Sequence, residues 1–322
     1  MIVTVTPNPS LDRTLEVEAL DRGEVVRAYA DRTDPGGKGV NVSRALVANG
    51  HASRAVLPLG GADGELLASL LQGLGIEVAA VPIADAIRSN VTVVEPDGTV
   101  TKLNALGPRL SDVEVEALLE RAVAAADGAA WTVASGSLAP GTPDDLYARL
   151  AAAVRPVGVR VAVDTSGPAL ERVLAAGPDV LKPNEEELSE VTGVIPETLG
   201  DVVVAANKLR SSGVATVVVS LGPSGAVLVG DGLAFHAESR AIVPRSTVGA
   251  GDALLAGFLA AGGEGPEALA EGVAWGAAAC ALPGTAVPGP ADLQRDLVQL
   301  HPVDPERPLG IGDDRRRRPT RA

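Results

Sequence analysis

Residues 246–257 carry the groups best suited to chemistry in this chain. The segment begins as a small, flexible turn and runs into an apolar stretch that predicts a buried helix. Gly249 and Gly251 permit positive φ and leave no side chain in the way of a bound group. With the amide of Ala250 between them, their free N–H groups would form a seat for an anion at the helix N-terminus. Asp252 lies beside that seat and could take a proton from an attacking hydroxyl, so the segment favours phosphoryl transfer.

The same segment also fits a purely structural interpretation. Glycine turns commonly precede helices, and an aspartate in the first turn can serve as an ordinary N-terminal cap without any chemistry. The position at a helix N-terminus further predicts a low pKa for Asp252, because the helix dipole favours the ionised carboxylate. The choice between the two interpretations therefore depends on the rest of the chain.

Four further loops end a predicted strand or open a predicted helix, which is where open α/β sheets bind ligands. Their candidate residues are Asp12 in the first loop, Gly36, Gly37, Lys38 and Asn41 in the second, Lys182, Asn184 and Glu187 in the third, and Ser220, Gly222 and Gly225 in the fourth. The second loop combines close backbone approach, a cation and an amide, which suits hydroxyl or phosphate recognition. A plain glycine turn is its structural alternative.

The other three loops leave similar alternatives open. Asn184 and Glu187 stand three apart at a helix start, which fits ordinary capping or the positioning of a metal ion and phosphate through water. The loop that contains Gly222 could bind a nucleotide or be only a tight turn. Asp12 could cap its loop locally or hold the hydroxyls of a substrate.

Composition limits the class of protein. The chain has 322 residues, of which 46% are hydrophobic and 21% charged, which predicts a globular body of one large α/β domain or two domains. Only 2% are aromatic, so the core must consist of Ala, Val and Leu. No apolar run is long enough to span a bilayer, and the N-terminus opens directly as a strand, so we expect a cytoplasmic protein.

Charge and metal-binding residues exclude further classes. The net charge of −14 repels nucleic acid and acidic membranes, so neither is expected as a partner. An anionic substrate would therefore need a local basic pocket or a metal ion. The three histidines have no ligand spacing, which argues against a structural zinc. The single cysteine, Cys280, lies in an apolar run and is predicted to be a core residue.

Two familiar nucleotide-binding signatures are missing. A Walker A loop needs Ser or Thr after its Gly-Lys pair, whereas Gly39 follows Lys38. A Rossmann fingerprint needs three spaced glycines after the first strand, where this chain has Pro7 and Pro9. These absences argue against a P-loop enzyme and against a dehydrogenase.

Apolar strand runs alternate with helical segments through most of the chain, which predicts a mostly parallel sheet with helices on both faces. Strands are expected at residues 2–6, 54–59, 77–82, 131–135, 159–164, 180–182 and 217–220, and helices at 42–49, 63–73, 111–124, 144–154, 168–175, 185–192 and 199–212. A hairpin at 226–236 and helices at 251–261, 266–282 and 290–300 are expected to follow.

Two early stretches and the C-terminus differ from this pattern. Residues 15–18 and 24–29 alternate without a helical period, and a predicted hairpin covers residues 88–104, so we expect a small β appendage outside the main sheet. Residues 303–322 are rich in Pro, Gly and Arg and have no period, which predicts a disordered tail. The main body would be one α/β domain over residues 1–302.

In their order along the chain, the five loops resemble those of the pfkB, or ribokinase-like, family of carbohydrate kinases. The matching segments are Thr6-Pro-Asn-Pro-Ser-Leu-Asp12, Gly36-Gly-Lys-Gly-Val-Asn41, Lys182-Pro-Asn-Glu-Glu-Glu187, Ser220-Leu-Gly-Pro-Ser-Gly225 and Thr247-Val-Gly-Ala-Gly-Asp252. The resemblance covers about residues 1–300. The Asn-Pro-x-x-Asp motif and the Asn-Val-Ser after the glycine loop resemble the branch of 1-phosphofructokinases and tagatose-6-phosphate kinases. Ribokinase-type members instead tend to carry Asn-Gln-Ala at the second place.

The resemblance implies a role for each matching residue. Asp252 would be the general base, and Gly249, Ala250 and Gly251 the anion hole. Asp12, Gly36, Gly37, Lys38 and Asn41 would bind the sugar, and Arg88 on a lid strand would contact the phosphate that the sugar already carries. Asn184 and Glu187 would organise Mg²⁺ and phosphate, with Glu187 acting on the metal through water. Lys182, Ser220, Gly222 and Gly225 would line the ATP site.

The family fold implied by the resemblance is a three-layer one, with a mostly parallel central sheet between helices and a small β-sheet lid. The lid would comprise about residues 12–35 and 86–105, and it often clasps a second subunit, so a homodimer through the lid is expected. Two features depart from the pattern: Ala139 stands where the branch commonly has Pro, and the run Arg315–Arg318 is atypical and is interpreted as a solvated charge run.

The expected activity is the phosphorylation of a ketohexose phosphate with ATP and Mg²⁺, and the first candidate reaction converts fructose 1-phosphate to fructose 1,6-bisphosphate. A tagatose-6-phosphate kinase or a minor 6-phosphofructokinase is the alternative enzyme. A catalytically silent regulator that binds nucleotide or sugar phosphate is an alternative of another class, and the intact Asp252 disfavours it. The sequence leaves open the hydroxyl that is phosphorylated, the size of the oligomer and any monovalent-cation requirement.

Overall fold

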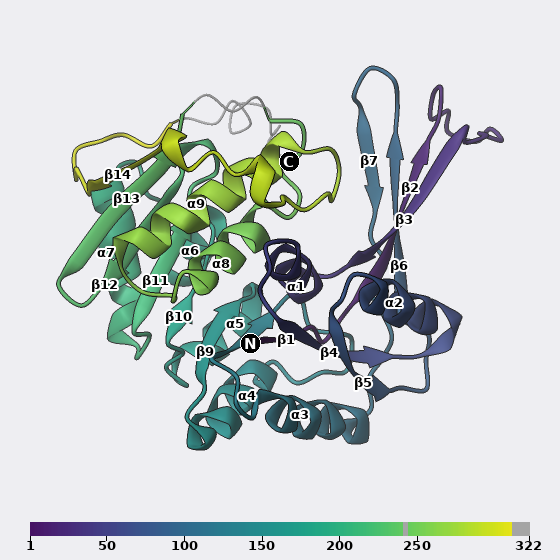
Figure 1. Cartoon of the computed structure of the whole chain (residues 1–322), viewed down its shortest axis with the longest axis horizontal. Coiled ribbons are helices and arrows are strands. Elements are labelled where there is room, and N and C mark those ends of the chain that lie inside the picture. Colours follow the sequence, from purple (N-terminus) through teal and green to yellow (C-terminus); the bar gives the residue numbers. More distant parts are fainter. Residues whose placement is uncertain (241–243, 311–322) are drawn as a thin grey trace.

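The body of the protein is a large sheet with helices on both faces (Figure 1). The computed structural model describes residues 1–240 and 244–310. The strands of the main sheet follow the order β14-β13-β12-β11-β10-β9-β8-β1-β4-β5. Their bounds are β1 (Ile2–Val5), β4 (Ser53–Leu59), β5 (Glu77–Pro82), β8 (Trp131–Ser135), β9 (Arg160–Asp164), β10 (Val180–Leu181), β11 (Thr216–Ser220), β12 (Ala226–Gly230), β13 (Leu233–Ser239) and β14 (Val298–Pro302). The predicted α/β class with a mostly parallel sheet is confirmed.

All pairings from β5 across to β11 are parallel, so the carboxyl ends of these strands meet at one edge of the sheet. β11, β12, β13 and β14 then pair antiparallel. The chain leaves β1 towards β4 and β5 on one side and later continues from β8 on the other side of β1. A crevice for ligands is expected outside the carboxyl ends where the strand order reverses in this way.

The described residues form three apolar clusters, and the two larger ones lie on opposite faces of the sheet, as the alternation of side chains along a strand requires. On β8, Val133 faces the core shared with α1, α8 and α9, while Ala134 faces the core shared with α3 to α7. The helices are α1 (Lys38–Ala48), α2 (Gly61–Gly73), α3 (Asp112–Ala126), α4 (Leu146–Val154), α5 (Gly167–Leu174), α6 (Glu185–Thr192), α7 (Leu199–Ser211), α8 (Ala250–Ala260) and α9 (Gly265–Ala281). Ser111 and Glu114 form a capping box at the start of α3, where a helix was predicted.

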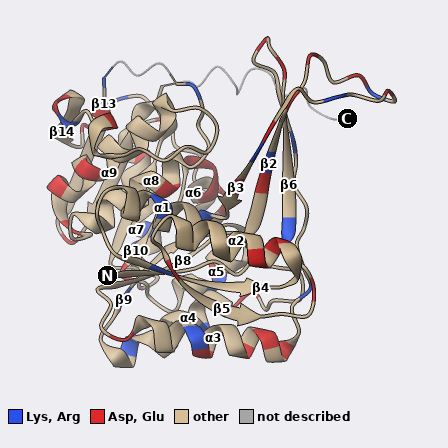
Figure 2. Ribbon diagram, turned by 45° about the vertical axis from the view of Figure 1, so that its right-hand side comes forward, with Lys and Arg blue, Asp and Glu red and all other residues tan. Residues whose placement is uncertain are grey.

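A separate small sheet stands off from the body beside α2 (Figure 2). Its strand order is β3-β2-β6-β7, with β2 (Ser10–Glu16), β3 (Ala30–Gly36), β6 (Arg88–Val94) and β7 (Val100–Leu103). We call this sheet the lid. The prediction of a strand at residues 24–29 was wrong, because the antiparallel pairing of β2 with β3 ends at Glu16 and Ala30 and leaves the residues between them as the connecting loop. The polar residues that follow form the strand instead.

The C-terminal prediction needs two corrections. Residues 290–300 do not form an α-helix: they make two short 3₁₀ turns and enter β14, which pairs with β13. The tail does not begin at residue 303, since the amides of Leu199, Gly200 and Leu309 bond the carbonyls of Arg307, Pro305 and Glu197. Leu309 is also buried at 9% exposure. The arginine run at 315–318 lies outside the described residues.

No helix in the described ranges is long and apolar enough to cross a membrane. The first helix begins earlier than predicted, at Lys38 instead of Val42. This shift places the whole Lys38–Asn41 segment inside the first turn of α1, which matters for the site.

Candidate active site

The N-terminus of α1 is built around glycines that could not be replaced without moving the end of β1. Gly37 caps the helix with φ +112°, and a Cβ there would lie 2.9 Å from the methyl of Thr6. A Cβ on Gly39 would overlap the hydroxyl of Thr6 and lie 3.0 Å from that of Ser135. α1 therefore starts against the carboxyl ends of β1 and β8, and Lys38 and Asn41 project from its first turn.

The N-terminus of α8 has the geometry predicted for an anion seat. Gly249 caps it in the left-handed region with φ +78°, and the space that a Cβ would enter there is open to 4 Å. A Cβ on Gly251 would lie 3.3 Å from the Nζ of Lys182, so that ammonium stands directly over the first turn of α8. The amides and the cation together favour negative charge at this point.

Asp252 is buried in the first turn of α8, with 7% of its surface exposed. Its Oδ2 accepts a hydrogen bond of 2.8 Å from Nδ2 of Asn41, across the contact between α8 and α1. Burial, and then the charge of Asp164, raise the pKa of Asp252 to about 6, against the opposing effects of Lys38, Asn41 and Lys182. The low pKa expected from the helix dipole was therefore wrong, because loss of hydration outweighs the dipole at this site.

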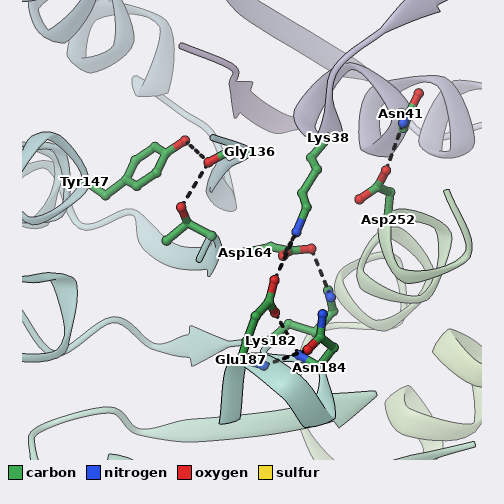
Figure 3. Close-up of polar contacts among 10 residues, drawn as sticks. Lys38, Asn41, Gly136, Tyr147, Asp164, Lys182, Asn184, Glu187 and Asp252 are labelled. Carbon is green, nitrogen blue, oxygen red and sulfur yellow. Dashed lines mark hydrogen bonds and ion pairs between the residues drawn. The ribbon is translucent and has the colours of Figure 1, made fainter. Parts of the chain in front are cut away.

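Asp164, the last residue of β9, joins the two lysines of the site (Figure 3). It is buried at 1% exposure, and its oxygens contact Nζ of Lys38 at 2.7 Å and Nζ of Lys182 at 2.9 Å. Burial alone would raise the pKa of Asp164, but the two ammonium groups lower it. Burial likewise opposes ionisation of Lys38, yet Asp164 and Glu187 hold its pKa above the usual value. Lys38 thus stays charged beside Asp252.

Sequence reasoning missed Asp164. The signal was available, because the residue ends a predicted strand at the same sheet edge as the other candidates, but it belongs to none of the five loop motifs. Beneath it, the buried hydroxyls of Tyr147 and Thr165 both donate to the carbonyl of Gly136, at 2.9 Å each. The amide of Gly136 in turn donates to the Asp164 carbonyl, so this side of the site is rigidly tied.

The Asn184–Glu187 pair is a capping box at the start of α6. Oδ1 of Asn184 accepts from the Glu187 amide and Oε2 of Glu187 accepts from the Asn184 amide, both at 2.8 Å. The capping interpretation is therefore correct as a description of these bonds. The other Glu187 oxygen, Oε1, lies 3.7 Å from Nζ of Lys38, so the same box also directs a carboxylate towards the centre of the site.

The root of the lid carries the first-loop candidates. Oδ1 of Asp12 accepts from the Ser10 hydroxyl at 2.8 Å and from Nδ2 of Asn90 at 2.9 Å. A Cβ on Gly36 would overlap the Asp12 carboxylate, so Gly36 allows β3 to pass directly beside it. These contacts fix Asp12 on the lid where β2 leaves the body.

Arg88 begins β6 and is anchored by backbone oxygens. Its guanidinium donates to the carbonyls of Asn8 at 2.9 Å and of Ala105 at 3.1 Å. Burial lowers the pKa of Arg88, and the Asp12 carboxylate partly offsets this. Arg88 thus belongs to the lid-root group with Asp12.

The fourth loop forms a 3₁₀ turn, Gly222–Ser224, after β11. Gly225, with φ +81°, is required to be glycine because a Cβ would overlap the carbonyl of Ala237 on β13. The amide of Ser220 donates to the Pro183 carbonyl at 3.0 Å, which places this turn beside the start of α6.

The structure sorts the predicted residues into three adjoining groups. The first group lies where the N-termini of α1, α6 and α8 come together, and it consists of Lys38, Asn41, Lys182, Asn184, Glu187, Gly249, Ala250, Gly251 and Asp252. The second group lies at the root of the lid and consists of Asp12, Gly36, Gly37 and Arg88. The third lies on the neighbouring turn after β11 and consists of Ser220, Gly222 and Gly225. Parallel strands bring these separate loops to one sheet edge.

The described residues hold no group of three or more His, Cys, Asp or Glu side chains that could bind a metal ion by themselves. The side chains at the site therefore do not fit a metal ion that is coordinated by protein ligands alone. They do fit Mg²⁺, which keeps several waters and binds through one or two carboxylates together with substrate phosphates.

Comparison with known proteins gives consistent matches over most of the chain. Residues 6–292 match the model of the pfkB family carbohydrate kinases. The chain is 41% identical over 263 residues to the 1-phosphofructokinase of Rhodobacter capsulatus, covering 80% of this chain and 82% of that protein. It is 38% identical over 299 residues to the ATP-dependent 6-phosphofructokinase isozyme 2 of Mycobacterium tuberculosis, covering 91% and 88%.

Among solved structures, phosphofructokinase-2 from Escherichia coli in complex with potassium superposes with a TM-score of 0.86. The two chains are 36% identical, and the match covers 90% of this chain and 96% of that one. The agreement extends to both the layered body and the small separate sheet.

Proposed function

The chain belongs to the pfkB family of carbohydrate kinases, and we propose that it transfers the γ-phosphoryl group of ATP to fructose 1-phosphate, giving fructose 1,6-bisphosphate. The observation that carries the proposal is the position of Asp252, buried in the first turn of α8 beside an open glycine cap and flanked by Lys38 and Lys182. A base, an anion seat and two cations at one point are the parts that phosphoryl transfer needs.

In the proposed reaction, Asp252 accepts the proton of the acceptor hydroxyl. Its pKa of about 6 suits a base that works near neutral pH, since the carboxylate is ionised yet more basic than an exposed one. In this proposal the backbone amides of Gly249 and Gly251 would face the phosphoryl group in transit and stabilise the charge on its oxygens. The Ala250 amide, which makes a long bond of 3.4 Å to the Thr247 carbonyl in the structure, would join them when that bond breaks. The side chain of Lys182, which stands over Gly251, adds a point charge at the same place.

ATP would occupy the side of the site formed by α6 and the turn at Gly222, and Mg²⁺ would neutralise charge on its phosphates. Glu187 would hold the ion through water, because one of its oxygens faces the site while the other is used in the capping box. The open space at Gly222, where a Cβ would meet nothing within 4 Å, gives the nucleotide access to the backbone.

The sugar phosphate would lie between Asp252 and the lid, with its hydroxyls towards Asp12 and Asn41. In a chain of net charge −14, the pocket must supply its own cations for a phosphorylated substrate. Arg88 at the lid root is the candidate for the existing phosphate, because its guanidinium can add two charge-assisted hydrogen bonds to those it makes with carbonyls.

A substrate screen tests the proposal. Coupled release of ADP is measured with fructose 1-phosphate, fructose 6-phosphate, tagatose 6-phosphate, free fructose and free ribose, and we expect the highest kcat/KM with fructose 1-phosphate. The 6-phosphofructokinase alternative, favoured by the likeness to isozyme 2 proteins, predicts that fructose 6-phosphate gives the highest value. A free sugar above all three phosphosugars would reject the phosphosugar assignment, and no ADP release with any sugar would favour the silent regulator.

The Arg88→Ala variant tests the phosphate contact. A charge-assisted hydrogen bond of roughly 1.5–3 kcal/mol corresponds to an increase in KM for the phosphosugar of about 10- to 150-fold, with KM for ATP unchanged. Arg13→Ala is the matched control, because Arg13 is a lid arginine that pairs with Asp63 and is exposed. Equal effects of both variants, or a change in KM for ATP, would reject the role of Arg88.

We also propose that the chain forms a homodimer through the lid and acts in the cytoplasm. Support for the dimer comes from large apolar side chains exposed on the lid and its loops: Val25 at 82%, Tyr29 at 56%, Val100 at 50%, Leu103 at 61% and Leu106 at 82%. Apolar residues gathered on one exposed element are typical of an interaction surface.

A further inference from the structure

Arg44 lies one helical turn beyond Asn41 on α1, and no loop motif includes it. Only 8% of its surface is exposed. Its Nη1 donates to Oδ1 of Asn41 at 3.3 Å and to the carbonyl of Pro35, near the end of lid strand β3, at 3.2 Å. Its Nε has no hydrogen-bond partner among the residues that the structure describes. Burying a guanidinium with an unsatisfied N–H group lowers the stability of the fold, so the contacts of Arg44 call for an explanation.

The contact between Arg44 and Asn41 decides which way the Asn41 amide faces. A guanidinium has only donors, so it must meet the oxygen of the amide and not its NH₂ group. Oδ1 of Asn41 is therefore committed to Arg44, and Nδ2 is left to donate to Asp252, as the 2.8 Å bond shows. The three side chains form a directed series from Arg44 through Asn41 to Asp252.

We propose that Arg44 is a positioning residue for the phosphoryl transfer, which it supports by fixing the Asn41 amide so that an N–H group always faces Asp252. The inference rests on the proposed function, in which Asp252 is the base. A donor that faces a carboxylate stabilises its ionised form and cannot accept a proton from its acid form. With Arg44 absent, the amide could turn and present Oδ1 to protonated Asp252, which would stabilise the acid.

Other charged groups also face this series. Asp164, Lys38 and Lys182 act on Asp252, the first raising its pKa and the lysines lowering it. Burial lowers the pKa of Arg44, whereas Asp34 and Asp12 raise it and Arg32 lowers it further. Within residues 1–240 and 244–310, none of these groups hydrogen-bonds the Asn41 side chain and so sets the direction of its amide, whereas Arg44 bonds its oxygen directly.

The test compares pH profiles of kcat/KM, whose acid limb reports the free enzyme. Arg44→Met removes the donors and keeps an unbranched side chain, and we expect the acid limb to move up by about one pH unit. Arg44→Lys keeps a donor-only cation and should restore most of the original limb. Arg54→Met is the control, because Arg54 is a partly buried arginine on β4 that bonds the Ala125 carbonyl and Glu77, and it should leave the limb in place. The phosphosugar also titrates near this range, but its pKa is the same for every variant.

A double-mutant cycle distinguishes the orientation of the Asn41 amide by Arg44 from a direct effect of the Arg44 charge on Asp252. In an Asn41→Leu background, Arg44→Met should cause no further shift of the acid limb, because the amide that it orients is gone. A shift of equal size with and without Asn41 would overturn the proposal, since Arg44 would then act on Asp252 by charge alone. An unshifted limb in Arg44→Met, with lower activity only, would overturn it as well.

A measurement on the unaltered enzyme covers the case in which Arg44→Met does not fold. With ¹⁵N-labelled asparagine, the Asn41 side-chain signal, identified by its loss in Asn41→Leu, should titrate near pH 6 and should stop doing so in Asp252→Asn. A signal that does not change with pH would mean that the NH₂ group does not face Asp252, which overturns the orientation on which the proposal depends. This readout needs no turnover, so it fails separately from the proposed function.

Discussion

Replacing Asp252 by Asn tests both the base and the physical cause of its raised pKa. The carboxylate is buried, and its pKa rises from an ordinary 3.8 to about 6. In the Asn variant the side chain keeps its size but cannot accept a proton. We expect kcat to fall by a factor on the order of 10²–10⁴, the usual contribution of a positioned base, while the nucleotide still binds.

The same substitution should stabilise the fold above pH 6. A carboxyl group with a raised folded-state pKa binds its proton more tightly in the folded protein, so the folded state loses stability as pH rises from about 4 to about 6. A shift of roughly two units at 1.36 kcal/mol per unit amounts to about 3 kcal/mol at neutral pH. Asp252→Asn removes this penalty, so its melting temperature should exceed that of the parent at pH 7.5 by roughly 5 °C, and the gain should vanish at pH 4.

Two assays read this prediction independently. Coupled ADP release gives kcat and KM across pH, and thermal melts without substrate avoid the titration of the sugar phosphate itself, whose second pKa is near 6 for a phosphate monoester. Asp144→Asn, at an exposed carboxylate, is the control and should change neither. Near-normal turnover of Asp252→Asn would remove the residue from the mechanism. An equal difference in melting temperature at pH 4 and pH 7.5 would refute the burial argument.

Two further predictions concern the C-terminal segment and the lid. Deleting residues 303–322 should lower the melting temperature by roughly 5–10 °C relative to deleting only 311–322, because four backbone hydrogen bonds to the body, at about 1 kcal/mol each, are lost. Equal melting temperatures of the two deletions would contradict the docking of residues 303–310. Leu103→Glu should convert the proposed dimer to a monomer, as measured by light scattering. The control Ile195→Glu, at a residue that is 73% exposed outside the lid, should leave the dimer intact. A parent chain that is already monomeric would reject the lid interface.

Errors in the predicted elements lie where pairing between distant segments decides the structure. The segment at 24–29 has the alternation of a strand, but within the described residues it joins no sheet and makes only one bond to β2, from the Tyr29 amide to the Glu16 carbonyl, because β2 pairs with residues 30–36 instead. A helix was predicted at residues 290–300, yet the free edge of β13 was available to residues 298–302, which form β14. In both places the local pattern was weak, and a hydrogen-bonding partner from elsewhere in the chain determined the outcome.

As far as the end of α9 at Ala281, the sequence alone determined the order of strands and helices in the body, because apolar runs of two different periods alternate clearly along it. It also identified the glycines, lysines and Asp252 of the loops, since helix starts and strand ends have local signals. Only the tertiary structure brought Asp164 into contact with Lys38 and Lys182 and, through burial and the charge of Asp164, raised the pKa of Asp252 above that of an exposed aspartate. Those properties arise from burial and from charges on separate elements of the chain, such as Lys38 and Asp164, which are 126 residues apart, and no local pattern records either one.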